Sequence, residues 1–278
     1  MSKILVVAEH DGARLNPSTL KCVCCASKVP DATVDVLVLA TDSAAVAAEA
    51  ATIAGVARVL AVDNPANAEG LAATKKIAED LGVKAWTYEC NVADGARVKE
   101  VIDQAARDMG GFDTLCHCAG ILRTYHTHEM TFAQWHEIID INLNGTFYVN
   151  QAALTHLLKN RFSALVNCSS TSALGSHPWM SAYAASKGGI LSMTRALYQE
   201  YVKQGLRANC VIPGGIATSL HGDFKAPPGA DMELLKGAMP FVGFAKPKHA
   251  ASVIAFLASD DARYINGTEI RADGGALS

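Results

Sequence analysis

Short apolar segments alternate with longer amphipathic ones along almost the whole chain, and this alternation constrains the fold more than any other feature. Segments rich in Val, Ile and Leu predict strands near 3–8, 34–40, 58–62, 84–90, 113–118, 163–169, 207–212 and 268–272. The stretches between them predict helices near 17–28, 43–54, 66–81, 94–109, 132–159, 179–203 and 247–258. Strands that alternate with helices form parallel sheets covered on both faces. We therefore expect an α/β fold with a doubly wound parallel sheet, and 278 residues suffice for one large domain of this kind.

Charge and hydropathy exclude several classes of partner. The net charge is −3, so nothing favours nucleic acid or an anionic membrane surface as a partner. No apolar run is long enough to span a bilayer. Residues 1–8 predict a first strand and are too short for a signal peptide. These features together predict a cytoplasmic protein.

The eight cysteines are expected to be reduced thiols, because the sequence shows no export signal. Cys116, His117 and Cys118 are consecutive and could suggest a metal site. On a strand, however, Cys116 and Cys118 share one face and His117 takes the other, so the three cannot jointly hold one ion. We expect no metal here. Cys22, Cys24 and Cys25 lie in the predicted helix 17–28 and are interpreted as small buried thiols.

Tyr183 and Lys187 stand four residues apart in the predicted helix 179–203, so their side chains project from the same side of it. A phenol normally titrates near pH ~10, and a cation one helical turn away favours the phenolate and lowers that pKa. Ser170 follows a predicted strand, and its hydroxyl can donate a hydrogen bond to a carbonyl oxygen where negative charge develops. These groups can move a proton to or from an alcohol oxygen, a step that usually accompanies hydride transfer.

Three further motifs surround these residues. Residues 166–170 predict a buried strand running into a Ser-rich loop, residues 181–189 a helix that begins with small residues, and residues 209–218 a strand ending in a Pro-Gly turn. With residues 140–147, Asp-Ile-Asn-Leu-Asn-Gly-Thr-Phe, they resemble the short-chain dehydrogenase/reductase family over about residues 66–278. The resemblance implies a Rossmann-like sheet and an NAD(P)-dependent oxidoreductase that interconverts a secondary alcohol and a ketone.

The same resemblance assigns a role to each catalytic residue. It implies that Tyr183 is the general acid/base and that Ser170 polarises the substrate carbonyl. Lys187 is expected to lower the tyrosine pKa and to bind the nicotinamide ribose. Asn142 is expected to hold a water molecule in a proton relay.

The resemblance also implies a set of cofactor-binding residues. Ala119 and Gly120 match the end of the family's Asn-Asn-Ala-Gly motif, although His117 and Cys118 replace the two Asn, a change that affects local hydrogen bonding more than catalysis. The turn that lines the nicotinamide matches Pro213, Gly214, Ile216 and Thr218, and Asn91 can bond an adenine edge. Tyr183 and Lys187 complete the set. The implied cofactor is NAD, with NADP as the alternative.

The first third of the chain departs from the family. A dinucleotide-binding first strand should run into a glycine-rich turn, and no such run occurs before residue 100. Residues 1–68 instead resemble the amino-terminal domain of the electron-transfer flavoprotein alpha subunit, in stretches 3–11, 15–20 and 51–60. No flavin is implied, because the flavin site of that family lies mainly in a domain that this sequence lacks. We expect one domain, with residues 1–68 completing the sheet and residues 69–278 forming the catalytic region.

Two arrangements of this segment are open. In the first, strand 34–40 takes the central position, residues 41–45 form the pyrophosphate loop, and Asp63 follows the second strand and favours NAD. In the second, strand 3–8 is central, residues 9–12 form the loop, Asp42 follows the second strand, and the sheet gains one strand. Both arrangements bring an acidic residue, Asp42 or Asp11, to the site of a diphosphate, so we expect weakened dinucleotide binding.

Residues 219–245 mix Pro and Gly with large apolar side chains and directly follow a strand of the expected active site. This composition predicts a lid and a fairly apolar alcohol or ketone as substrate. Residues expected near the pocket include Leu122, Ser172, Trp179 and Met180. By resemblance, homodimers or homotetramers would form through the helices that hold Asn142 and Tyr183.

Three functions therefore remain open. The first is the NAD(P)-dependent oxidoreductase. The second is a hybrid protein with an intact tetrad and impaired or absent dinucleotide binding, with a chimeric N-terminus. The third is an interaction module whose first segment docks a flavoprotein partner.

Overall fold

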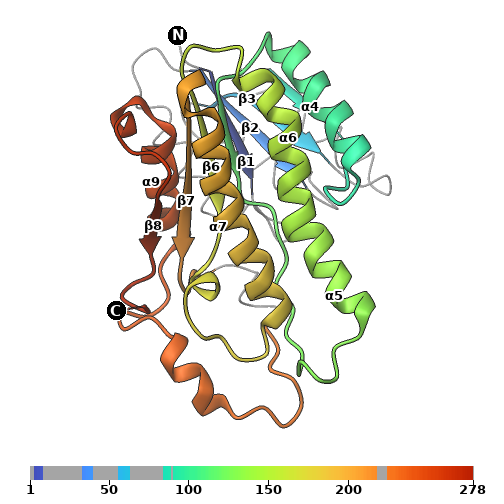
Figure 1. The fold of residues 1–278 in the computed structure, drawn as a ribbon, viewed down its shortest axis with the longest axis vertical. Coiled ribbons are helices and arrows are strands. Elements are labelled where there is room, and N and C mark those ends of the chain that lie inside the picture. The colour runs from blue at the N-terminus through green and yellow to red at the C-terminus, as the bar shows by residue number, and fades with distance from the viewer. Residues whose placement is uncertain are drawn as a thin grey trace.

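One parallel sheet runs through the part of the chain that the computed structural model describes, which is residues 3–8, 33–39, 56–62, 84–88, 90–217 and 224–277. Within these ranges eight strands form the sheet in the order β4-β3-β2-β1-β5-β6-β7-β8 (Figure 1). The strands are β1 (Lys3–Ala8), β2 (Thr33–Leu39), β3 (Val56–Val62), β4 (Lys84–Thr87), β5 (Thr114–His117), β6 (Ser163–Cys168), β7 (Leu206–Pro213) and β8 (Glu269–Ala272). The predicted parallel sheet is confirmed.

Strand β1 occupies the centre of the sheet. It pairs with β2 on one side, where Lys3 lies opposite Thr33, and with β5 on the other, where Ile4 lies opposite Thr114. Of the two arrangements open from the sequence, the structure has the second. The sheet therefore contains one strand more than the first arrangement would give, and the chain leaves the central strand at Ala8. The loops after β1 and β2, with Asp11, Asp42 and the predicted helices 17–28, 43–54 and 66–81, lie outside the described residues.

Helices separate the strands of the second half. They are α4 (Gly95–Met109), α5 (Phe132–Ile139), α6 (Gly145–Leu157), α7 (Ser181–Tyr201) and α9 (Pro247–Ala258), with short turns η2 (Asp140–Asn144), η3 (Thr171–Ala173), η4 (Val202–Gln204), η5 (Met232–Ala238) and η6 (Asp260–Ala262). Figure 1 shows α6 and α7 lying in front of the strands, and α9 packs against β5 to β8.

Helix α4 shows why these segments are helical. Asp94 caps its first turn through the Arg97 N–H at 3.1 Å, and Gly110 ends it at φ 69°.

The predicted helix 132–159 is interrupted. Helices α5 and α6 are joined by the π-helical turn η2, in which the Gly145 N–H donates to the Asp140 carbonyl, five residues back. Single π turns within α-helices are frequent at functional sites. Asn142 lies in the middle of this turn and is completely buried.

The core lies where the sheet is covered by helices. All four residues of β5 are buried, and so are five of the six in β6, as expected of parallel strands between two layers of helices. Helices α4 and α6 contribute the apolar faces that pack together here, including Ile102, Ala105 and Leu157. Among the described residues, no helix is both long and apolar enough to cross a membrane.

Candidate active site

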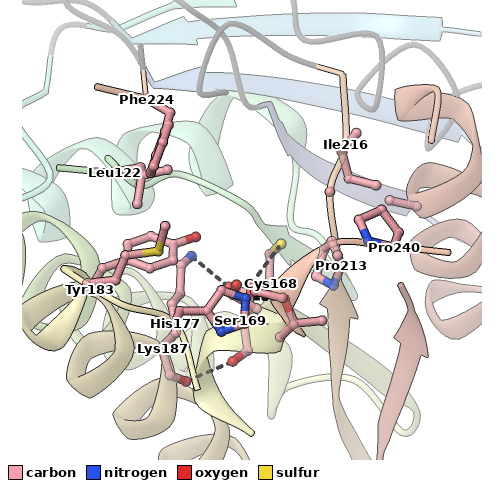
Figure 2. Close-up of a pocket in the computed structure, with 18 of the residues that line it drawn as sticks. Leu122, Cys168, Ser169, His177, Tyr183, Lys187, Pro213, Ile216, Phe224 and Pro240 are labelled. Carbon is pink, nitrogen blue, oxygen red and sulfur yellow. Dashed lines mark hydrogen bonds between the residues drawn. The ribbon is translucent and has the colours of Figure 1, made fainter. Parts of the chain in front are cut away.

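A cavity of about 200 Å³ opens at the carboxyl ends of β5, β6 and β7 (Figure 2). Ligand sites of open parallel sheets lie at this edge. Seven of the residues predicted from the sequence to serve catalysis or cofactor binding line the cavity: Gly120, Ser170, Tyr183, Lys187, Pro213, Gly214 and Ile216.

Tyr183 and Lys187 lie in the first two turns of α7, and both are almost fully buried, at 7% and 4% exposed. The Lys187 Nζ lies 5.6 Å from the centre of the Tyr183 ring. It donates a hydrogen bond to the Cys168 carbonyl at 3.1 Å, which fixes the amine at the end of β6. A cation held beside a phenol favours the phenolate. This geometry matches the predicted pairing of the two side chains.

Ser170 lies in the loop that follows β6, where it begins η3. Its Oγ accepts a hydrogen bond from the Ser172 N–H at 3.2 Å, so the Ser170 O–H remains a donor that can point into the cavity. The neighbouring Ser169 Oγ donates to the Lys187 carbonyl at 2.8 Å. This bond ties the serine loop to α7, so Ser170 and Tyr183 are held on the same cavity.

Asn142 lies behind the cavity wall. Its side chain bonds the backbone of Ile121 twice, accepting from the N–H at 2.7 Å and donating to the carbonyl at 2.9 Å. Its Nδ2 also donates to Ser186 Oγ at 3.2 Å. A Cβ added at Gly120 would lie 3.1 Å from Asn142 Oδ1 and 3.4 Å from Lys187 Nζ. Glycine at position 120 therefore allows Asn142 and Lys187 to approach the end of β5 together.

His117, which replaces an Asn of the family motif, connects β5 to the helix that follows Asn142. Its Nε2 lies 3.1 Å from Thr146 Oγ1, and that hydroxyl donates to the Asn142 carbonyl. Because the Thr146 hydroxyl gives its only proton to the Asn142 carbonyl, it can only accept from His117. His117 Nε2 therefore carries a proton and donates it to Thr146 Oγ1. Burial, with a smaller effect of the Lys187 charge, lowers the pKa of His117 to about 3, so the ring is neutral. Its Nδ1 has no hydrogen-bond partner among the described residues.

The other residues predicted to bind the cofactor do not all lie at the cavity. Ala119 packs against the core beside the cavity. Asn91 is exposed and does not line the cavity, and its Oδ1 accepts from the Ala93 N–H at 3.0 Å in the turn before α4. Asp63 and Thr218 lie outside the described residues, so their roles stay predictions.

The predicted lid segment supplies one wall of the cavity. The lining residues from this segment are Phe224, Leu235, Ala238, Met239, Pro240 and Phe244. Leu122 and Met180, expected near the pocket, also line it, whereas Ser172 and Trp179 do not. Trp179 instead adopts φ 63° and accepts the Tyr125 N–H at its carbonyl, just before α7 begins. A closing motion of the segment stays a prediction.

Sequence reasoning missed His177, Thr171 and Cys168 in the lining. His177 follows Ser170 by seven residues in an irregular loop, and no periodicity indicates which way such a side chain points. Cys118 lines the cavity while His117 points to Thr146, so the two neighbouring side chains point in different directions, as the strand alternation predicts. Within the described ranges, no three His, Cys, Asp or Glu side chains lie close enough to hold a metal ion.

The described residues fit the nicotinamide half of a dinucleotide. Gly120 and Gly214 allow close packing at the cavity wall, since a Cβ at Gly120 would lie 3.1 Å from Asn142 Oδ1 and a Cβ at Gly214 would lie 2.8 Å from the Asp273 backbone. Lys187 and Tyr183 offer the polar groups for a ribose and a reacting oxygen. When bound, such a cofactor supplies or accepts the hydride.

Comparison with known proteins agrees with this geometry. A family model described as enoyl-(acyl carrier protein) reductase matches residues 41–276. The 3-oxoacyl-[acyl-carrier-protein] reductase FabG of Thermotoga maritima is 35% identical over 209 residues, 75% of this chain and 84% of that protein. The D-threitol dehydrogenase of Mycolicibacterium smegmatis is 36% identical over 221 residues, 79% of this chain and 83% of that protein.

A crystal structure of a Burkholderia xenovorans protein assigned to the short-chain dehydrogenases/reductases has a TM-score of 0.74 at 25% identity, over 99% of this chain and 96% of that one. The chain belongs to the short-chain dehydrogenase/reductase family and has its Rossmann-like fold. The family match begins at residue 41, inside the segment 1–68, so the comparisons give no support to the electron-transfer flavoprotein resemblance of that segment. A division at residue 68 stays a prediction.

Proposed function

We propose that this protein is an NAD(P)-dependent oxidoreductase that interconverts a secondary alcohol and a ketone. One observation carries the proposal. Ser170, Tyr183 and Lys187 come from two separate elements and line a single cavity, with Asn142 directly behind its wall. The family contains oxidoreductases of this kind, which supports the assignment of reaction class.

The residues act on the substrate oxygen. For ketone reduction, the Ser170 O–H donates to the carbonyl oxygen and stabilises the charge that develops on it. Tyr183 gives its proton to the same oxygen, and the Lys187 ammonium stabilises the phenolate that remains. Asn142, fixed by the Ile121 backbone, keeps the turn η2 in a shape that places its side chain next to Lys187 and Gly120. In the oxidative direction the same groups act in reverse.

A substitution of Tyr183 tests this proposal. Tyr183→Phe removes the acid/base hydroxyl, so kcat for ketone reduction is expected to fall by ~10²–10⁴-fold while the protein stays folded. Tyr264→Phe is the matched control, because Tyr264 is fully exposed and does not line the cavity. Equal activity of both variants would refute the role of Tyr183.

Dinucleotide binding is the second requirement. The preference for NAD that Asp63 would confer belongs to the first arrangement, which the structure does not have. In the arrangement found, Asp42 is the acid that follows the second strand, β2, and an acid there suits ribose hydroxyls, so we expect NAD to bind more tightly than NADP. Thermal-shift titration of the wild type and Asp42→Ala with both dinucleotides measures this preference, with Asp63→Ala as the control. A folded protein that binds neither NAD(H) nor NADP(H) would rule out the oxidoreductase.

That result would favour the second candidate, a folded protein with an intact site and no working dinucleotide site. Its supporting observation is the sequence, which has no glycine-rich run before residue 100 where the family carries its pyrophosphate turn. Bound dinucleotide, or turnover that disappears in Tyr183→Phe, would exclude this candidate.

The proposed substrate is fairly apolar, and the proposed assembly is a homodimer or homotetramer. Leu122, Met180 and Phe224 in the cavity lining support the apolar substrate. Exposed Phe132 and Phe147 on α5 and α6, at 85% and 44%, support assembly through these helices. Light scattering on the purified chain measures the assembly.

A further inference from the structure

The loop between β6 and α7 brings a second polar pair to the cavity, next to Ser170. Thr171 and His177 both line it, and Thr171 is only 4% exposed. The His177 Nδ1 lies 3.2 Å from the Gly175 carbonyl, and its Nε2 lies 3.2 Å from Thr171 Oγ1. Neither contact is needed for the proton transfer described above.

The two contacts fix where the protons lie. A carbonyl oxygen can only accept, so the Nδ1 that faces Gly175 carries the proton of the neutral imidazole. Nε2 of that tautomer has a lone pair and no proton. The Thr171 hydroxyl must therefore donate to His177, and its oxygen keeps its lone pairs for another partner.

Adjacent residues thus present opposite polarity to the cavity. Ser170 accepts the Ser172 N–H and offers a donor, whereas Thr171 donates to His177 and offers an acceptor. Both residues line the same cavity of about 200 Å³, so one small molecule bound there can meet both hydroxyls. A donor suits the reacting carbonyl oxygen, and an acceptor suits a second group that has an O–H to give.

We propose that Thr171, oriented by His177, selects substrates that carry a hydroxyl group one or two bonds from the reacting carbon, so that the preferred substrates are hydroxy ketones and diols. The inference rests on the proposed function and narrows its substrate class. Leu122 and Phe224 lie across the cavity from His177 in Figure 2, so the remaining part of a preferred substrate is apolar. A substrate with a second carbonyl in place of the hydroxyl has no proton for Thr171 and is disfavoured.

The test compares three ketones of equal carbon skeleton, which are 3-hydroxy-2-butanone, 2-butanone and 2,3-butanedione. For the wild type, kcat/KM for the hydroxy ketone is expected to exceed that for 2-butanone by about tenfold or more. Thr171→Val removes the acceptor, and the ratio of these two kcat/KM values should fall to near one. Thr171→Ser keeps the hydroxyl and should keep the preference.

In His177→Leu, the preference between the hydroxy ketone and 2,3-butanedione is expected to shift toward 2,3-butanedione. A merely structural role of His177 would not produce such a shift. Without the Nε2 lone pair, the Thr171 O–H is free to donate, so kcat/KM for 2,3-butanedione should rise relative to the hydroxy ketone. An unchanged ratio in both Thr171→Val and His177→Leu would overturn the inference.

A binding measurement separates this inference from the proposed function. NMR titration of Tyr183→Phe protein gives the dissociation constants of 2,3-butanediol and 2-butanol without turnover. The diol is expected to bind about tenfold more tightly, with the difference lost in Thr171→Val. Equal affinities overturn the inference. A diol preference together with a wild type that turns over no substrate supports the inference and refutes the oxidoreductase.

Discussion

The hydroxyl of Thr146 offers a sharp test of how the turn around Asn142 is stabilised. It accepts from His117 Nε2 and donates to the Asn142 carbonyl, and Thr146 and His117 are 0% and 2% exposed. Thr146→Val keeps the size of the side chain but removes both hydrogen bonds. A buried donor left without a partner costs ~1–3 kcal/mol, and the carbonyl, which keeps a second lone pair, adds ~0.5–1.5 kcal/mol. We therefore expect the free energy of unfolding to fall by ~1.5–4.5 kcal/mol.

Equilibrium unfolding in urea, followed by circular dichroism at one protein concentration, measures this change. Thr155→Val is the matched control in the same helix, because the Thr155 hydroxyl is exposed and donates only to the Ala152 carbonyl at 2.8 Å. Its effect should stay within ~0.5 kcal/mol. A Thr146→Val protein as stable as the Thr155→Val control would show that the His117 to Asn142 connection contributes nothing.

Three further outcomes follow from backbone and burial. Gly205→Ala should unfold at a much lower urea concentration than Gly111→Ala. Both glycines have φ above 90°, but only at Gly205 would a Cβ meet a carbonyl oxygen, that of Arg161 at 2.1 Å. Similar urea midpoints for the two variants would contradict this. Burial lowers the pKa of His117 from 6.5 to about 3, so between these values the unfolded chain takes up a proton that the native protein does not. The native protein therefore loses stability as pH falls below 6.5, and His117→Asn should remove up to ~1.4 kcal/mol of that loss per pH unit, measured by urea unfolding at pH 6.5 and pH ~5. Burial raises the pKa of the Cys210 thiol to about 12, so iodoacetamide at about pH 8.5 should modify the partly exposed Cys168 well before Cys210. Mass spectrometry measures the two rates, and equal rates would contradict the burial of Cys210.

Much of the fold could be predicted because its signals are local. The apolar segments at 3–8, 114–117 and 163–168 are short and continuous, and a buried parallel strand needs no more than that. The capped helix α4 also begins where the sequence predicts it, because Asp94 and Gly110 act on neighbouring residues. The interruption of the predicted helix 132–159 has no such signal, since a π turn depends on what packs around Asn142.

Some residues of the candidate site could be predicted from the sequence and others could not. Ser170, Tyr183 and Lys187 were predictable because their spacing matches a family pattern, and the structure brings them to one cavity. Thr171 and His177 were not, because their bond depends on how a loop folds back on itself.

The sequence by itself determined the parallel α/β class and the groups available for proton transfer, since both depend on residue type and on spacing within one element. Only the tertiary structure decided which strand is central. Both candidate strands are equally apolar, and the choice depends on hydrogen bonds between β1 and β5, more than a hundred residues apart. The tertiary structure also decided the polarity of the cavity, because whether Thr171 donates or accepts depends on the partner that its hydroxyl meets.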